Sequence, residues 1–197
     1  MKYLFIDTSY SFIISIIVDD KIVYYNSLNN TLTSSKIMST LDLGLSNANL
    51  KLNDIDKIFI VTGPGSFTGI RVGVTLAKTI GYLLNIPLIE LSELEFLATT
   101  SVDTKYVVPI IDARRGYVYG GIYDNNLNVI YKDSHILLED LKEKIDDTYT
   151  FVDNCLNVDL LKIIKKHEFD EAKNPHLLVP NYLKNTEAEE KLNDKRD

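Results

Sequence analysis

Residues 62–73 read Thr-Gly-Pro-Gly-Ser-Phe-Thr-Gly-Ile-Arg-Val-Gly, and this stretch decides how the fold is interpreted. The apolar run at 57–61 before it predicts a short buried strand, and the pattern after it predicts a helix over about 68–84. A glycine-rich turn between a strand and a helix N-terminus can bind an anion, because backbone N–H groups and the helix dipole both favour negative charge. Three interpretations of this turn compete.

The turn is not a Walker A loop, since no Gly-Lys-Ser/Thr follows its glycines. A dinucleotide fingerprint is favoured by Glu90, which follows the turn at about the distance of a ribose-binding acid. Against it, the glycine spacing is off by one, Pro64 removes a backbone donor, and a hairpin of two strands rich in Ile and Val comes first. The third interpretation is architectural: the glycines allow close packing, and Ser66 or Thr68 caps the helix.

Arg71 lies in the first turn of the predicted helix, where the helix dipole disfavours a positive charge. A cation held there needs a carboxylate or a phosphate beside it. The residue is therefore either an anchor for an ion pair or a functional contact, and the sequence leaves both open.

The predicted helix over 68–84 is apolar on two faces, and its only charges are Arg71 and Lys78. A surface helix of a globular protein shows one apolar face. The second face is therefore either buried inside this chain or in contact with a partner protein, and a predicted helix over 34–49 could share that surface. One stripe of the first helix runs along Phe67, Ile70, Val74, Ala77, Gly81 and Leu84, and a second along Val72, Leu76, Thr79 and Leu83. The residues predicted to dock a partner are Ile37, Leu41, Leu45, Phe67, Ile70, Val74, Ala77 and Gly81.

Two aspartates follow strands at corresponding places in the two halves of the chain. Asp7-Thr8-Ser9 ends the first predicted strand, and Asp112 opens a turn over 112–116. In actin-like (sugar kinase, Hsp70) ATPase folds, such turns approach the phosphates and the metal. Here Ser9 puts a Cβ where a phosphate needs bare backbone, and the second turn lacks a Gly-Gly pair. Asp7 could also be an ordinary turn residue.

The remaining polar residues form no recognisable catalytic or metal-binding set. Arg114 and Arg115 are adjacent at a predicted hairpin tip and should point to opposite faces. Cys155 is the only cysteine, so no intrachain disulfide can form, and a structural thiol is favoured over a nucleophile. The three histidines lack metal-ligand spacing; they are His135, His167 and His176.

The chain is acidic, with 28 Asp and Glu against 21 Lys and Arg and a formal net charge of -7. This balance argues against direct, tight binding of nucleic acid. Asp7 interrupts the first apolar run too early for a signal peptide, and no run is long enough to cross a bilayer. A cytoplasmic protein without membrane contact is expected.

The predicted elements give an α/β protein of two lobes. Residues 1–100 form the N-terminal lobe with the docking helices, 101–184 a smaller C-terminal lobe, and 185–197 a charged, solvated tail. Further helices are expected over 136–145 and 156–166, and Ser92 with Glu95 should form a capping box.

Four stretches together resemble the TsaB (YeaZ) family. They are 6–9 (Ile-Asp-Thr-Ser), 62–73, 111–123 (Ile-Asp-Ala-Arg-Arg-Gly-Tyr-Val-Tyr-Gly-Gly-Ile-Tyr) and 180–184 (Pro-Asn-Tyr-Leu-Lys). The resemblance implies an actin-like ATPase (ASKHA, ribonuclease H-like) fold with two lobes of mixed sheets, a reduced second lobe and no working ATPase site. This chain departs from the family pattern at 32–38. TsaB proteins carry a His-Ser pair and a Leu-Leu-Pro run there, so a divergent partner surface is expected.

The resemblance also implies a function. The chain would be a non-catalytic scaffold or activator that pairs with the metal-containing catalyst TsaD and the ATPase TsaE, and the complex transfers threonylcarbamoyl to tRNA adenosine. Homodimers through the same helices are known in the family. No metal or cofactor of its own is implied; ATP or ADP would bind only at a subunit interface, and tRNA only indirectly. The family-motif residues, some of which could contact such a nucleotide, are Asp7, Ser9, Gly63, Gly65, Thr68, Gly69, Arg71, Asp112, Arg114 and Arg115.

Two enzymatic alternatives remain open at this point. One is an actin-like ATPase, or a peptidase acting on the partner. The other is a nicotinamide-dependent reductase, which would need NAD to bind at the glycine-rich turn.

Overall fold

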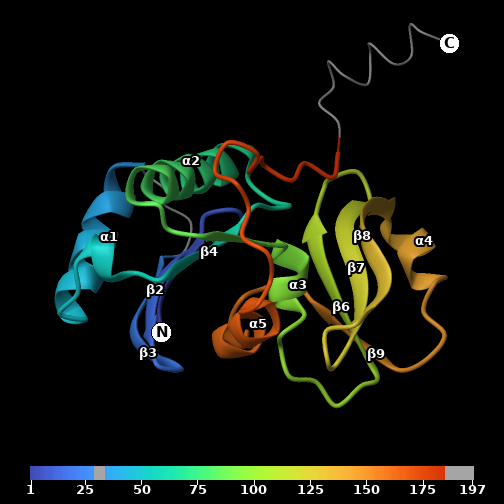
Figure 1. Ribbon diagram of the computed structural model, residues 1–197. Helices are drawn as coiled ribbons and strands as arrows, with labels where there is room; N and C mark the ends of the chain where they lie inside the picture. The colour runs from blue at the N-terminus through green and yellow to red at the C-terminus, as the bar shows by residue number, and fades with distance from the viewer. Residues whose placement is uncertain (29–33, 185–197) are drawn as a thin grey trace, which may run out of the picture.

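The computed structural model describes residues 1–28 and 34–184 of the 197-residue chain (Figure 1). The predicted charged tail at 185–197 and the first residues of the predicted divergent segment at 32–38 lie outside the described residues. Within these ranges the chain forms two sheets with helices on their faces (Figure 1).

The first sheet has five strands in the order β3-β2-β1-β4-β5. Strands β1 to β3 pair antiparallel, and β4 and β5 add to β1 in parallel. This order is that of the actin-like, ribonuclease H-like fold and confirms the predicted fold class. The strands are β1 (Lys2–Asp7), β2 (Phe12–Val18), β3 (Lys21–Leu28), β4 (Lys57–Val61) and β5 (Leu88–Leu91).

The second sheet repeats the first four strands of this pattern, in the order β8-β7-β6-β9, and has no equivalent of β5 in the described part of the chain. Strands β6 to β8 pair antiparallel, and β9 pairs parallel with β6. The expectation of mixed sheets with a reduced second one is confirmed. The strands are β6 (Tyr106–Asp112), β7 (Tyr117–Asp124), β8 (Val129–Leu137) and β9 (Tyr149–Val152).

Three apolar layers hold the sheets and helices together. Helices α1 (Ser34–Asn47) and α2 (Phe67–Leu84) cover one face of the first sheet (Figure 1). The other face packs against α3 (Glu93–Leu97), α5 (Leu160–His167) and one face of the second sheet in a single core cluster. The short α4 (Leu138–Lys142) covers the outer face of the second sheet. The two sheets therefore share one apolar core.

The segment after α5 returns to the first sheet; we call residues 173–184 the strap. The N–H of Lys173 donates to the Leu88 carbonyl at 2.8 Å, and the N–H of Asn181 donates to the Thr62 carbonyl at 2.8 Å. Leu178 is buried in the core between α2 and the first sheet. The division into lobes at 100/101 stays a prediction, but the strap, which it assigned to the second lobe, packs on the first sheet.

Several predicted element boundaries were wrong. The helix expected over 136–145 is only α4, because β8 continues to Leu137 and pairs with β7. The helix expected over 156–166 begins at Leu160, where the Asp159 side chain accepts a hydrogen bond from the Lys162 N–H. Ser92 does cap α3, but Glu95 does not complete a capping box; its carboxylate bonds instead to α5.

Candidate functional site

The glycine-rich turn lies directly against the first aspartate turn. The N–H of Ser66 donates to the Ser9 carbonyl at 2.5 Å. A Cβ on Gly65 would come within 2.3 Å of the same Ser9 oxygen, and a Cβ on Gly69 within 2.0 Å of the Thr8 oxygen. Real Cβ atoms do not approach oxygens this closely, so glycine is required at both positions. Because these two residues lack side chains, the backbones of the two turns can pack directly against each other. This contact favours the architectural interpretation of the turn.

Side-chain bonds complete this contact between the two turns. Ser66 is the N-cap of α2, because its Oγ accepts from the Gly69 N–H at 3.2 Å. The Thr8 hydroxyl donates to the Gly69 carbonyl at 2.7 Å. Gly63 accepts a hydrogen bond from the Glu93 N–H at 2.9 Å through its carbonyl. Of the two predicted caps, Ser66 is confirmed, and Thr68 is instead exposed on the surface of α2.

Two fully buried carboxyl groups meet behind the turns. Asp7 ends β1, and Glu93 opens α3. The Ser9 hydroxyl lies between them, 2.7 Å from Asp7 Oδ1 and 2.8 Å from Glu93 Oε2. A hydroxyl has one hydrogen to donate, and two ionised carboxylates can only accept. Both contacts are therefore satisfied only when one of the carboxyl groups is protonated and donates to Ser9 Oγ.

The surroundings identify Glu93 as the group that keeps the proton. Burial, and then the charge of Asp7, raise the pKa of Glu93 well above its usual range. Burial also raises the pKa of Asp7, to about 6, although bonds from the Ser9 N–H and hydroxyl oppose that rise. Asp7 Oδ2 is buried without a hydrogen-bond partner among the described residues. At neutral pH the pair is best described as a carboxylate on Asp7 and a carboxylic acid on Glu93.

Cys155 contacts this pair from the segment before α5. Its Sγ lies 3.6 Å from Glu93 Oε1. Burial is the largest cause of the raised pKa of this thiol. A thiol with a raised pKa is a weak nucleophile, which agrees with the prediction of a structural cysteine. The sequence indicated no relation between Cys155 and the aspartate turn.

The second aspartate turn is open and lies at the tip of the β6–β7 hairpin. Asp112 Oδ1 accepts from the Arg114 N–H at 2.9 Å. Arg114 and Arg115 are exposed and both adopt the left-handed backbone conformation, with φ of 69° and 54°. Non-glycine residues enter that region at a cost. In the described part of the chain no hydrogen bond or ion pair joins their side chains to the acid pair, so the role of these motif residues stays a prediction.

An open groove lies between α1 and α2 and has a volume of about 540 Å³. Its walls are mainly apolar. Met38 and Phe67, two large apolar side chains, are exposed at 47% and 43%. The residues that line the groove are Ile37, Met38, Phe67, Thr68, Arg71, Val72, Thr75, Leu76 and Thr79.

The structure corrects which residues form the free face of these helices. Most of the predicted docking residues point into the core, because the first stripe of α2 faces the sheet. Only Phe67, and the edge of the buried Ile37, reach the groove. The second stripe, which includes Val72, Leu76 and Thr79, is the face left open. The predicted residues that lie in the core are Leu41, Leu45, Ile70, Val74, Ala77 and Gly81.

Arg71 stands at one end of the groove, over the ring of Phe67. Its guanidinium carbon lies 3.9 Å from the centre of the Phe67 ring, and its Nε donates to the Tyr182 hydroxyl at 2.9 Å. The Phe67 and Tyr182 rings stack at 4.6 Å. Among the described residues Arg71 forms no ion pair with a carboxylate. The alternative of an ion-pair anchor is therefore not supported by the described part of the chain.

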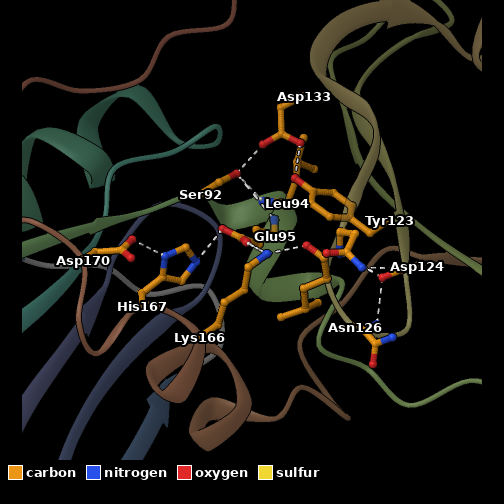
Figure 2. A network of polar contacts seen from close by, with 12 residues as sticks. Ser92, Leu94, Glu95, Tyr123, Asp124, Asn126, Asp133, Lys166, His167 and Asp170 are labelled. Atoms are coloured by element: carbon orange, nitrogen blue, oxygen red, sulfur yellow. Dashed lines mark hydrogen bonds and ion pairs between the residues drawn. The ribbon is translucent and has the colours of Figure 1, made fainter.

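A second polar network, which the sequence did not suggest, joins α3 to the second sheet and to α5 (Figure 2). Ser92 Oγ and the Tyr123 hydroxyl both donate to the carboxylate of Asp133. Glu95 accepts from Lys166 at 2.7 Å and lies 3.0 Å from His167 Nε2. Figure 2 shows these side chains gathered around α3, so the network fixes that helix between its neighbours.

Two further features are absent from the described residues. No group of three or more His, Cys, Asp or Glu side chains in 1–28 and 34–184 is placed to hold a metal ion. No helix in the same ranges is long and apolar enough to span a membrane.

Comparison with solved structures agrees with the fold. The chain superimposes on YeaZ from Pseudomonas aeruginosa with a TM-score of 0.76, covering 92% of this chain and 99% of that one at 19% identity. A second Pseudomonas aeruginosa structure, described as an uncharacterized protein with similarity to peptidase YEAZ, gives a TM-score of 0.77 at 20% identity and covers 93% and 99% of the two chains. At these identities the likeness concerns the fold alone.

Comparison of sequences shows the family. The family model TsaD, tRNA N6-adenosine threonylcarbamoyltransferase, matches residues 30–149. The Bacillus subtilis tRNA threonylcarbamoyladenosine biosynthesis protein TsaB is 33% identical over 97% of both chains. The Haemophilus influenzae TsaB is 34% identical over 49% of this chain and 42% of its own. The chain therefore belongs to the family that the TsaD model describes and, within it, to the TsaB proteins of tRNA threonylcarbamoyladenosine biosynthesis.

Proposed function

We propose that this protein is a non-catalytic scaffold or activator subunit for the modification of tRNA adenosine with threonylcarbamoyl. It docks on a TsaD-type catalytic subunit through the groove between α1 and α2, and a TsaE-type ATPase joins the pair. The single observation that carries the proposal is the open apolar groove, whose lining includes exposed side chains such as Met38 and Phe67. Large apolar surface left open on a soluble protein is typical of a protein–protein contact.

The closed turn supports an accessory role over an ATPase of its own. A phosphate would need the space between the two turns, and the backbone of Gly65 and Gly69 occupies it against Ser9 and Thr8. The acid pair behind the turns would also repel an anion. In this proposal any ATP or ADP binds at a subunit interface, tRNA is contacted mainly by the other subunits, and the complex works in the cytoplasm.

Direct binding tests this proposal. The purified full-length chain is titrated calorimetrically with the TsaD-type protein of the same organism. Thr75 lines the groove and is exposed, so Thr75→Arg places a charge in the interface without disturbing the core. We expect at least a tenfold weaker association, as for the loss of about 1.4 kcal/mol. Asn157→Arg, on the exposed segment before α5, is the matched control and should bind as the unmodified chain does.

Two results would contradict the proposal. Association that Thr75→Arg leaves unchanged would exclude the groove as the docking site. Micromolar binding of ATP and Mg²⁺ by the chain alone, with turnover, would replace the accessory role by that of an ATPase. Light scattering of the isolated chain shows whether a second copy occupies the groove when the partner is absent.

A further inference from the structure

The geometry points to Arg71 as the recognition residue of the groove: we infer that it binds a carboxylate carried by the partner beside the apolar residues that fill the groove. Phe67 and Tyr182 hold its guanidinium ready for that contact. This inference rests on the proposed docking function and adds the chemistry by which the partner is selected.

Arg71 is fixed in place but keeps most of its hydrogen-bonding capacity. The Phe67 ring lies under its guanidinium at 3.9 Å, the Tyr182 ring lies 5.9 Å away, and Nε is bonded to the Tyr182 hydroxyl. An arginine has five N–H donors. No described residue accepts a hydrogen bond from the four N–H groups on the Nη atoms, and the side chain is exposed at the mouth of the groove. Two of these N–H groups, one on each Nη atom, can bind a carboxylate through two parallel hydrogen bonds.

The Phe67 ring and the Tyr182 hydroxyl stabilise the Arg71 guanidinium, but no opposite charge of the described residues neutralises it. Arg71 is the fifth residue of α2, just past the first turn, so the helix dipole does not favour a cation there. No carboxylate of the described residues lies within ion-pair distance. A guanidinium held beside an apolar groove would lose its water when a partner covers it, and such burial is unfavourable unless the partner supplies a negative group. A partner with a carboxylate at this end of the groove satisfies that requirement.

The charges on the two helices favour such a partner over a second copy of this chain. Helices α1 and α2 carry three cations, Lys36, Arg71 and Lys78, against one carboxylate, Asp42. Of these, Arg71 is the charged residue that lines the groove, and Lys78 is bonded to the strap instead, while the whole chain has a net charge of -7. A second copy facing the groove would present the same lining, which contains no carboxylate, whereas an acidic apolar surface would complement Arg71.

The strap is the element that positions Arg71. Tyr182 follows Asn181, whose N–H is bonded to the Thr62 carbonyl at 2.8 Å beside the glycine-rich turn. Farther along α2, Lys78 Nζ donates to the Leu178 carbonyl of the same strap at 2.9 Å. The strap is therefore held at both points, and the Tyr182 hydroxyl has a fixed place from which to orient Arg71. Tyr182 is a positioning residue for the contact, and Arg71 makes it.

Arg71 variants test the inference in the full-length chain, titrated with the TsaD-type protein of the same organism. Arg71→Glu should weaken association at least a hundredfold, and Arg71→Lys about tenfold, because lysine keeps the charge but not the fork. Tyr182→Phe removes only the hydroxyl and should weaken association several-fold. Lys21→Glu, at the exposed start of β3, is the charge control and should have no effect. Thermal unfolding verifies that each variant is folded.

A charge exchange identifies the partner group directly. Each acidic residue on the apolar helices of the TsaD-type protein is changed to arginine and titrated against Arg71→Glu. One of these changes should raise the affinity for Arg71→Glu at least tenfold, while it weakens binding to the unmodified chain. Restoration by a single position supports the inference, since a general change of net charge would act equally at all positions.

The outcomes separate this inference from the proposed function. If Thr75→Arg abolishes association and Arg71→Glu does not weaken it, the groove docks the partner but Arg71 does not recognise a carboxylate, and the inference is overturned alone. If neither variant matters, the proposed function fails. The inference is also overturned if no partner position restores binding, if inorganic phosphate competes for Arg71 at micromolar concentration, or if Arg71→Glu acts only by dissociating a homodimer.

Discussion

Replacing Glu93 with glutamine removes a buried carboxyl group from the core, and it should stabilise the protein in alkaline solution. Glu93 and Asp7 are both fully buried and share the Ser9 hydroxyl. Only a protonated Glu93 can donate to Ser9 Oγ while Ser9 donates to Asp7. The amide N–H of a glutamine can make the same donation. The variant therefore keeps the hydrogen bond and loses the group that resists ionisation.

The magnitude follows from the linkage between pKa and stability. Burial raises the pKa of Glu93 in the folded protein, so the stability that its proton provides is fully present below about pH 4.3, the pKa of an unfolded glutamate. That stability is lost as the pH rises through the folded pKa, by about 1.4 kcal/mol for each unit between the two values. Glutamine does not titrate. The free energy of unfolding of Glu93→Gln, relative to the unmodified protein, should therefore increase by at least about 1.4 kcal/mol between pH 5 and pH 8.

Urea unfolding followed by far-UV circular dichroism at pH 5, 6, 7 and 8 measures this difference. Glu95→Gln is the matched control, because Glu95 lies two residues along the same helix and its pKa shifts the other way. Burial alone would raise the pKa of Glu95, but bonds from His167 and Lys166 outweigh burial and lower it. Its stability is present above about pH 4.3 and is lost only in more acidic solution. Glu95→Gln should thus lose about 1–3 kcal/mol at pH 7.

One result would refute the reasoning about the acid pair. If Glu93→Gln were destabilised by more than about 2 kcal/mol to the same extent at every pH, Glu93 would be ionised in the native protein. The hydrogen of Ser9 would then have to serve both carboxylates, and the assignment of the proton to Glu93 would be wrong.

Three further predictions concern the neighbouring residues. Burial alone would lower the pKa of His167, but its bonds to Glu95 and Asp170 outweigh burial and raise it. The stability that protonated His167 contributes is therefore present below about pH 6.5 and is lost as the pH rises through the folded pKa. His167→Gln should thus cost more stability at pH 6 than at pH 8 in the same urea assay. Gly69→Ala would put a Cβ 2.0 Å from the Thr8 oxygen, so the variant should lose more than about 3 kcal/mol of unfolding free energy or fail to fold. The control Gly116→Ala has a φ of 79°, and its Cβ would meet only a Leu137 methyl at 3.9 Å, so it should lose about 1–2 kcal/mol. Equal losses would contradict the packing argument. The raised pKa of the Cys155 thiol should make it react with a disulfide reagent at pH 8 at least about tenfold more slowly than in the urea-unfolded chain; comparable rates would show an accessible thiolate.

The elements that local patterns define were predictable from the sequence. The apolar runs of β1, β2 and β4 and the long helix after the glycine-rich turn lie close to where periodicity places them. Ser92 was also predictable as a cap, because an N-cap bond involves residues two and three positions away. Such features depend on residues that are close together in the sequence, so local patterns reveal them.

The acid pair was not predictable, because it depends on contacts between distant segments. Ser9 and Glu93 are 84 positions apart. A glutamate in the first turn of a helix is ordinarily explained by the helix dipole, so nothing local marks Glu93 as buried. The orientation of α2 was missed for a related reason. Its two stripes have similar composition, and only the position of the sheet decides that Ile70 and Val74 are core while Val72 and Leu76 line the groove.

The closed turn and the open groove depend on the same short segment. Because Gly65 and Gly69 carry no side chains, the backbone of the turn can press against the first aspartate turn, and Ser66 caps α2 at that point. In a phosphate-binding turn such N–H groups would face the ligand; here the N–H of Ser66 is bonded to the Ser9 carbonyl and the N–H of Gly69 to the Ser66 side chain. Phe67 and Arg71 then project outward from the first turns of the helix, toward α1 and the strap. A substitution that reopened the turn would therefore also displace Phe67 and Arg71, so we expect phosphate binding at the turn to disturb the groove that we propose for docking.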